Sequence, residues 1–315
     1  MLLQMVCLVP GIVSHREEGK KRRPAGAARG SRSDQPDGGA TTGERRVLDI
    51  LVYLSAGAVA GLLSGLFGIG GGVIIVPVLL ALFTFRQMPD PVVMHMAVGT
   101  SLATIVFTAI SSVRSHWVRG GVLPPVFIRL VIGMCIGAVL GALIADQMSG
   151  ELLKAVFGVF LVALGLQLAL GRGPKVGAAS TTPSGFILAP AGTVIGGISS
   201  LLGIGGGAMT VPLLAKLGVQ MRQAVGTSAA CGMPIALVGA VAFMATGYGH
   251  PELPDKAIGY VYWPAFLGVI AMSLFTAPLG ARLAHALPQH ILRRAFSILL
   301  VLLGLNLLRP LIFSG

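Results

Sequence analysis

The chain has 315 residues, of which 54% are hydrophobic and only 11% are charged, and its mean hydropathy is +0.86. Soluble domains carry roughly a quarter charged residues, so this composition excludes an ordinary soluble protein and predicts a polytopic membrane protein. The formal net charge of +12 lies in an N-terminal tail and in short loops. Nucleic-acid binding would need that charge on one folded face, so we interpret it as the positive-inside signal of a membrane protein.

Residues 1–46 form a basic, polar tail behind a short apolar run at 1–13. The run is too short to span a bilayer and has no basic residues ahead of it, so it fits neither a membrane helix nor a signal peptide. We expect a disordered tail on the cytoplasmic side. Whether these residues belong to the native protein is left open.

Apolar segments then follow in a regular series, separated by short loops. In a first half, 47–170, they cover about 47–67, 73–85, 92–113, 126–145 and 152–170. A linker at 171–184, rich in Gly, Pro, Ser and Thr, leads to a second half, 185–315. Its segments cover about 186–202, 208–217, 223–245, 259–284 and 289–308. The sequence predicts an all-α membrane protein with two repeats of four to five membrane segments each.

A glycine run interrupts the first apolar segment of each half. GLFGIGGG ends at Gly72 and is followed by Val-Pro at Pro77; LLGIGGG ends at Gly207 and is followed by Val-Pro at Pro212. AVGTS likewise occurs at 97–101 and again at 224–228. Matched motifs in the same order indicate internal duplication, which is typical of secondary transporters. An odd number of crossings in each half would make the repeats inverted, which we expect; four crossings would make them parallel.

Each glycine run predicts a broken helix. Irregular backbone survives in a membrane only where protein or a watered cavity surrounds it, and the half-helix behind the break presents free N–H groups and a positive dipole end. An anion is the natural ligand, although glycines that merely permit close helix packing are the alternative. The candidate substrate-binding glycines are Gly68, Gly70, Gly71, Gly72, Gly203, Gly205, Gly206 and Gly207, with Pro77 and Pro212 as structural or hinge residues.

The repeated Gly-Thr-Ser triplets add hydroxyl groups, which can donate to an oxyanion without bringing a charge into the membrane. The candidates are Thr100, Ser101, Thr227 and Ser228, with Gly99 and Gly226 as hinges. The alternative is that these hydroxyls bond back to their own helix. Ser64 and Ser199, one turn before the breaks, leave the same two interpretations open.

No carboxylate falls in the middle of a predicted span, although cation transporters and proton pumps usually need one. The six acids outside the tail lie at predicted segment ends or in loops: Asp49, Asp90, Asp146, Glu151, Glu252 and Asp255. The histidines outside the tail also lie near predicted membrane boundaries, where we expect surface positions. This pattern favours an anionic or neutral substrate.

The sequence suggests no enzyme, no metal site and no cofactor. It contains no nucleophile and base pair and no metal-ligand spacing, and its three cysteines, Cys7, Cys135 and Cys231, are isolated. The expected partners are a small anionic substrate and the lipid bilayer, with no nucleic acid; a homo-oligomer is left open. A channel or cation permease and a non-transporting scaffold remain alternative functions.

With both glycine runs, the trailing Val-Pro pairs and both AVGTS motifs, residues 47–310 resemble the TauE/SafE family of sulfite exporter-like permeases. The basic tail departs from the usual start of that family. The resemblance implies a permease in the cytoplasmic membrane of a prokaryote. It also implies transport of sulfite, an organosulfonate such as sulfoacetate, or a related sulfur-containing anion.

Overall fold

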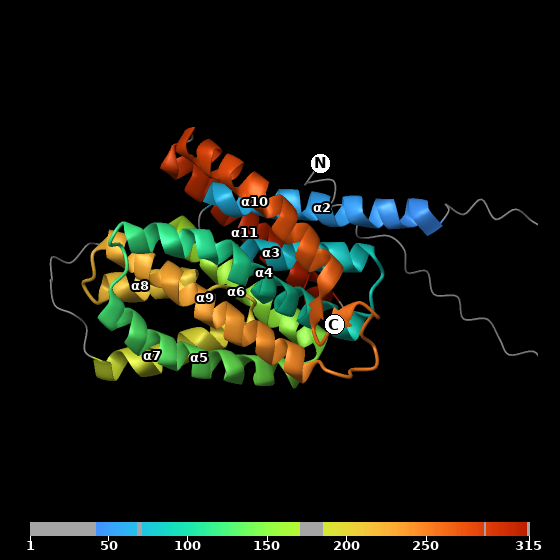
Figure 1. Ribbon diagram of the computed structural model, residues 1–315, viewed down its shortest axis with the longest axis horizontal. Helices are drawn as coiled ribbons and strands as arrows, with labels where there is room; N and C mark the ends of the chain where they lie inside the picture. Colours follow the sequence, from blue (N-terminus) through green and yellow to red (C-terminus); the bar gives the residue numbers. More distant parts are fainter. Residues whose placement is uncertain (1–41, 68–70, 171–184, 287, 314–315) are drawn as a thin grey trace, which may run out of the picture. The chain divides into compact units, whose positions relative to one another are not determined.

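The structure is a computed structural model that describes residues 42–67, 71–170, 185–286 and 288–313. Ten helices and one small hairpin make up the described part of the chain (Figure 1). The first five helices are α2 (Thr42–Phe67), α3 (Gly72–Phe85), α4 (Asp90–Val118), α5 (Pro124–Asp146) and α6 (Gly150–Leu170). The second five are α7 (Gly185–Leu201), α8 (Gly207–Lys216), α9 (Met221–Thr246), α10 (Trp263–Ala286) and α11 (Gln289–Phe313).

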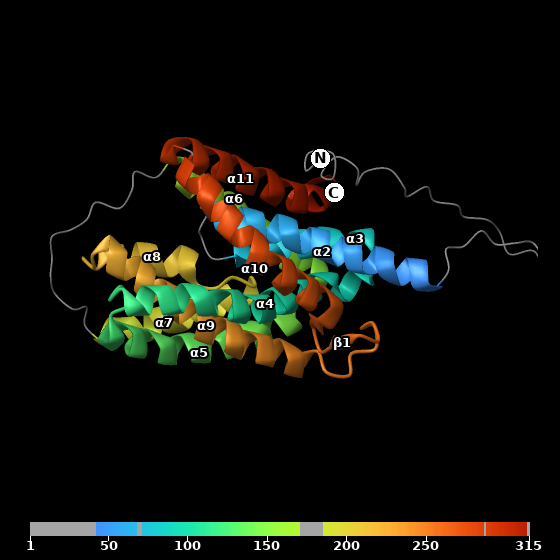
Figure 2. The ribbon, with the colours of Figure 1, turned by 45° about the horizontal axis from the view of Figure 1, so that its top comes forward.

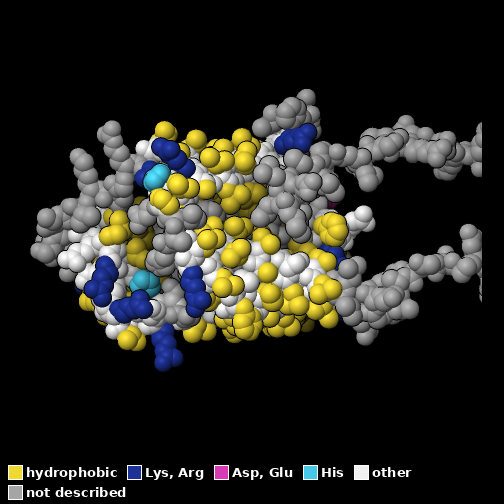
Figure 3. All heavy atoms as spheres, turned by 90° about the horizontal axis from the view of Figure 1, so that it is seen from above, with side chains coloured by type: hydrophobic (Ala, Val, Ile, Leu, Met, Phe, Trp, Pro, Cys, Tyr) yellow, Lys and Arg dark blue, Asp and Glu magenta, His cyan; other side chains and the backbone are white. Residues whose placement is uncertain are grey.

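Six of these helices are long and apolar enough to cross a membrane: α4, α5, α6, α9, α10 and α11. Large apolar side chains also point outward, as Ile132, Ile136 and Leu143 do on α5, while the glycines and alanines of the same helix are buried. Figure 3 shows hydrophobic side chains over the middle of one face and several Lys and Arg side chains toward the left end of that view. These features confirm a helical, polytopic membrane protein.

The predicted segments and the observed helices differ at two places. We expected a helix from residue 259, but strands β1 (Ala257–Ile258) and β2 (Val261–Tyr262) pair there and α10 begins at Trp263. Gly259 makes the turn with a positive φ of 52°, and Pro264 suits the first turn of the helix that follows. At the other place, α2 begins at Thr42, inside the predicted tail.

Two pairs of helices pack closely across the halves of the sequence. α2 lies along α10 and α5 lies along α7 (Figures 1 and 2). Successive glycines of one helix face small residues of the other: Gly57, Gly61 and Gly65 meet Gly268, Ser273 and Ala277, and Gly133, Gly137 and Gly141 meet Ala189, Thr193 and Gly197. Residue numbers rise together along both pairs, so each pair is parallel. Small residues allow this close approach, which drives helix association in lipid.

The remaining long helices pair in the opposite sense. Gly99, early in α4, lies against Phe243, late in α9, and Gly121, just after α4, lies against Gly226, early in α9. α6 and α11 behave alike, because Gly158 lies against Gly304 whereas Gly165 lies against Ser297. Both pairs are therefore antiparallel.

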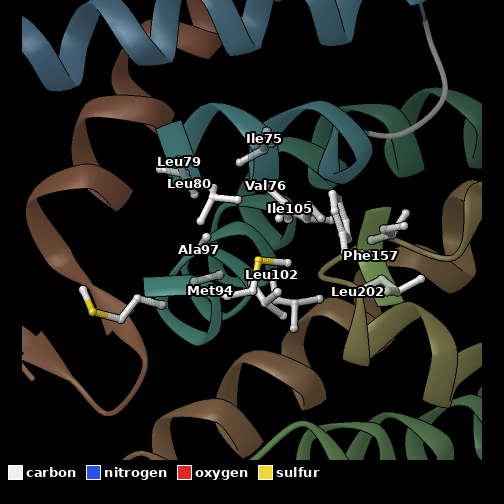
Figure 4. Close-up of a cluster of buried hydrophobic side chains, with 14 of the residues drawn as sticks. Ile75, Val76, Leu79, Leu80, Met94, Ala97, Leu102, Ile105, Phe157 and Leu202 are labelled. Atoms are coloured by element: carbon white, nitrogen blue, oxygen red, sulfur yellow. The ribbon is translucent and has the colours of Figure 1, made fainter. Parts of the chain in front are cut away.

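The core lies where α3, α4 and α6 meet the end of α7. Figure 4 shows Val76 from α3, Ala97 and Leu102 from α4, and Phe157 from α6 in one cluster with Leu202. Each of these five side chains is at most 1% exposed. This cluster packs beside the start of α3 and the end of α7, where the second glycine break begins.

Candidate functional site

The two breaks are described to different extents. Gly68 and Gly70 lie outside the described residues, so the first break is seen only from Gly71 and Gly72 onward. The second is described in full, from the end of α7 at Leu201 to the start of α8 at Gly207. Each half-helix behind a break contains the predicted proline, Pro77 in α3 and Pro212 in α8.

The breaks touch each other. A Cβ on Gly72 would overlap the carbonyl oxygen of Gly203 and would lie 2.8 Å from the Cα of Ile204. Any side chain at Gly72 would therefore push the two backbones apart. Segments far apart in the sequence thus meet in the interior, at the start of one half-helix.

The end of α7 has the geometry of a Schellman cap. Gly203 has a φ of 70°, its N–H donates to the carbonyl of Ser200 at 3.1 Å, and the N–H of Ile204 donates to that of Ser199 at 2.7 Å. The left-handed region penalises a Cβ, so glycine is required at this position by conformation and not only by space.

The start of α8 has a second left-handed glycine. Gly206 has a φ of 71°, and its carbonyl accepts the N–H groups of Met209 and Thr210 as well as the Thr210 hydroxyl at 2.9 Å. The N–H groups of the first helical residues, Gly207 and Ala208, precede the first intrahelical bonds, as at any helix start. Gly205 lies in the bend between, with Ile105 3.2 Å from its would-be Cβ.

The threonines of the two triplets hold loops from the opposite half. Thr100 Oγ1 accepts the N–H of Tyr262 at 3.0 Å, and Thr227 Oγ1 accepts that of Leu123 at 2.9 Å. Tyr262 directly precedes α10 and Leu123 directly precedes α5. The matched hydroxyls therefore fix the two loops that lead into a matched pair of helices.

The glycines of the triplets let these loops approach. A Cβ on Gly99 would lie 2.7 Å from the carbonyl oxygen of Tyr260, and one on Gly226 would overlap the carbonyl of Gly121. Each Gly-Thr pair is thus a contact site for a loop, in which the glycine leaves room for the loop backbone and the threonine hydroxyl accepts a loop N–H group. The sequence analysis did not predict this contact. The signal that could have indicated it is the Gly-Thr pair, which occurs at matching positions in both halves.

The serines of the two triplets differ from each other. Ser101 Oγ donates to the carbonyl of Gly203 at 3.0 Å, so it joins α4 to the second break. Ser228 is equally buried, but its hydroxyl has no hydrogen-bond partner among the described residues. Of the four predicted hydroxyls, the structure brings only Ser101 into bonded contact with a described part of either glycine break.

Ser64 and Ser199 lie beside the starts of the half-helices. Ser64 Oγ lies 3.0 Å from the position that a Cβ atom would take on Gly71, and Ser199 Oγ lies 3.7 Å from the corresponding position on Gly206. Beside Ser199 the side chains leave a packing gap that has no room for a water molecule. Its lining consists of Phe160, Ile198, Ser199, Leu202, Ile204, Gly206, Ala208 and Met209.

One titratable cluster lies away from the breaks. His95 was expected at the surface, yet it is only 3% exposed, with its ring nitrogens 3.2 and 2.9 Å from the carbonyl oxygens of Pro91 and Ala145. Its ring stacks on Tyr260 at 5.0 Å, and the Tyr260 hydroxyl donates to Asp146 at 3.0 Å. Burial, and then the bond to Asp146, raises the pKa of Tyr260 above its ordinary value. Tyr260 therefore stays a neutral donor.

The sequence has relatives throughout its membrane part. It is 38% identical to a probable membrane transporter protein of Haemophilus influenzae over 82% of this chain and 97% of that protein. It is 29% identical to the probable membrane transporter protein MJ0441 of Methanocaldococcus jannaschii, over 83% and 96%, and 27% identical to the probable membrane transporter protein YunE of Bacillus subtilis, over 85% and 100%. No solved structure matches the chain significantly.

The match to a family extends over nearly all of the described helices. Residues 53–307 fit the family described as sulfite exporter TauE/SafE, and this stretch contains both glycine breaks and both Gly-Thr-Ser triplets. Family and relatives agree on a membrane transporter. The chain belongs to the sulfite exporter TauE/SafE family.

Proposed function

We propose that this protein is a secondary transporter that moves a small sulfur-containing anion, sulfite or an organosulfonate, across the cytoplasmic membrane. The observation that carries the proposal is the contact between the two glycine breaks, Gly72 against Gly203, in the interior of a membrane protein. It joins the start of α3 to the bend between α7 and α8, and the positive end of a half-helix would stabilise an oxyanion at such a break.

The buried polar groups favour an anion over a cation. Among the described residues, the buried polar side chains are serines, threonines and His95, with no carboxylate. Hydroxyl groups can donate to an oxyanion, whereas a cation would need carboxylate or carbonyl ligands.

The helix directions support an inverted duplication. α4 and α9 hold corresponding places in the two halves and run antiparallel, and so do α6 and α11. Two copies related by an axis in the membrane plane would have this arrangement. Such a pair could expose one central site to either side in turn.

Flux measurements in proteoliposomes test the proposal. We expect the full-length protein to carry sulfite or sulfoacetate down a gradient, and Gly205→Leu to stop this flux because its side chain would enter the second break against Ile105. Flux of Na⁺ or Ni²⁺ in place of the anions would favour a cation permease. No flux of any of them would favour a scaffold.

A further inference from the structure

His95 is a buried residue that can take up a proton near neutral pH. The other buried polar side chains of the described residues are serines and threonines, and imidazole is the side chain that ordinarily changes charge between about pH 5 and 8. The proposed function gives His95 no part so far. A titratable group is costly to bury in a membrane protein, so it is by default a candidate for function.

Both ring nitrogens of His95 face hydrogen-bond acceptors. Nδ1 lies 3.2 Å from the carbonyl oxygen of Pro91, one turn earlier in α4, and Nε2 lies 2.9 Å from the carbonyl oxygen of Ala145. A neutral imidazole has one N–H group, so it can donate to only one of these oxygens and leaves the other facing a lone pair. The protonated ring has two N–H groups and satisfies both. The contact between α4 and α5 is therefore complete only when the ring holds a second proton.

The surroundings of the ring can accommodate the charge that this proton brings. Ala145 lies in the last turn of α5, where the carbonyl groups form the negative end of the helix. Asp146 follows it and adds a carboxylate, which accepts the Tyr260 hydroxyl at 3.0 Å. The Tyr260 ring stacks on His95 at 5.0 Å, within the distance at which an aromatic face attracts a cation.

Tyr260 covers this histidine. The ring of His250 also contacts Tyr260, with the centroids 6.1 Å apart, and it is partly exposed, whereas His95 is only 3% exposed. The titratable and charged groups around the cluster come from the end of α5, the loop after α9, and the starts of α4 and α6: Asp146, Tyr260, His250, Asp90, Glu151 and Lys154. A proton on His95 is thus held beneath an aromatic ring and does not lie open to water.

The helix that carries His95 also contacts the second glycine break. Ser101 follows His95 by six positions on α4, roughly 9 Å along the axis, and its hydroxyl donates to the carbonyl of Gly203 at 3.0 Å. Between them, Gly99 lies against the carbonyl oxygen of Tyr260. The loop that covers His95 and the backbone of the break are therefore both in contact with one short stretch of α4.

We propose that His95 binds the proton that drives transport, so that the anion crosses together with H⁺. The proton adds to the lone pair of the unprotonated ring nitrogen when Tyr260 moves aside, and it leaves the same ring after the anion has left. It offsets part of the anion's charge while both are inside the protein. This inference rests on the proposed function and adds to it the coupling ion and the residue that binds it.

Accumulation of sulfoacetate in proteoliposomes tests the coupling, because this anion stays ionised near neutral pH. The membrane potential is held at zero with potassium and valinomycin, and the interior is set about one pH unit above the exterior. One proton per anion can then drive about tenfold accumulation, and we expect at least about threefold for wild type. Sulfite takes the place of sulfoacetate if it alone is carried, and protein-free liposomes control for passive entry.

Variants assign the proton to one residue. His95→Gln removes the titrating ring and keeps an N–H donor, so it should abolish the accumulation while measurable downhill flux remains. His250→Gln, the matched control, changes the partly exposed histidine that contacts the same tyrosine and should accumulate the anion as wild type does. Tyr260→Leu keeps His95 but removes the ring that covers it. It should also lower the accumulation, which gives a second test if His95→Gln does not fold.

Several outcomes would overturn the inference. Full accumulation by folded His95→Gln or folded Tyr260→Leu would do so. A wild type that carries the anion downhill but does not accumulate it, or accumulates it on the acidic side, would do so as well, and anion transport would stand. If wild type carries no anion downhill, the proposed function itself fails.

Discussion

The two glycine breaks are nearly identical in sequence and differ in the residues that follow them. The first leads into Val73 and Ile75, which are buried, whereas the second leads into Ala208, which is partly buried, and Thr210, whose hydroxyl donates to the carbonyl of Gly206. A duplicated motif is therefore followed by different side chains in the two halves, and the two copies need not be equivalent.

The largest expected effect concerns the glycines of the second break. Gly203→Ala would place a Cβ at a φ of 70°, 3.1 Å from the Cα of Val98, and we expect a loss of about 2–4 kcal/mol in the free energy of unfolding. Gly205→Ala meets only a side-chain methyl of Ile105 at 3.2 Å and should lose less than about 1 kcal/mol. Unfolding in a denaturant series measures both. Equal losses would show that conformation at Gly203 is not the reason for its glycine.

The loop contacts at the two Gly-Thr pairs predict a smaller loss of unfolding free energy, of similar size at both pairs. Thr100→Val and Thr227→Val each leave a backbone N–H without its acceptor, so each should cost about 1–3 kcal/mol. Thr104→Val is the control, because in the described part of the chain the Thr104 hydroxyl bonds only to the carbonyl of Thr100 in its own helix. If Thr104→Val were as costly as the other two, the loop contacts would not be the cause.

The hydrogen bond between Tyr260 and Asp146 predicts that the stability of the protein depends on pH. Tyr260→Phe removes the bond to Asp146 and should cost about 1 kcal/mol. The pKa of Tyr260 is raised in the folded state, so its contribution is fully present below the ordinary tyrosine pKa of about 10 and is lost as the pH rises above it. Thermal unfolding from pH 7 to 11 should therefore show a steeper alkaline decline for wild type than for Tyr260→Phe. Identical declines would contradict this role.

The smallest effect separates the two triplet serines. Ser101→Ala loses the bond to Gly203 and should cost about 1 kcal/mol, whereas Ser228→Ala removes a hydroxyl that bonds to none of the described residues and should be neutral or slightly stabilising. The difference in unfolding temperature between the two variants is the measurement. A larger loss for Ser228→Ala would indicate a partner for that hydroxyl.

Much of the fold could be predicted because the length of the apolar segments and the glycines that interrupt them determine where membrane helices begin and end. A helix was found for each of the ten predicted segments, and the predicted breaks separate α2 from α3 and α7 from α8. The hairpin at 257–262 was missed because its four strand residues are too few to show the alternating pattern of a strand. They could not be distinguished from the start of an apolar helix.

The site was harder to predict, because side-chain contacts between distant segments leave no local pattern. That Thr100 and Thr227 accept backbone N–H groups depends on loops more than 100 residues away. The symmetric pair of sites that the duplicated glycines suggested stays a prediction. His95 was expected at the surface, but it is buried against Tyr260, a contact that depends on the hairpin.

The most direct test of the account is sulfite flux in proteoliposomes through Gly205→Leu, whose side chain would enter the second break against Ile105. We predict that its flux falls at least about tenfold below that of wild type while the protein stays folded. Wild-type flux in the folded variant would contradict the claim that the glycine breaks form the transport site.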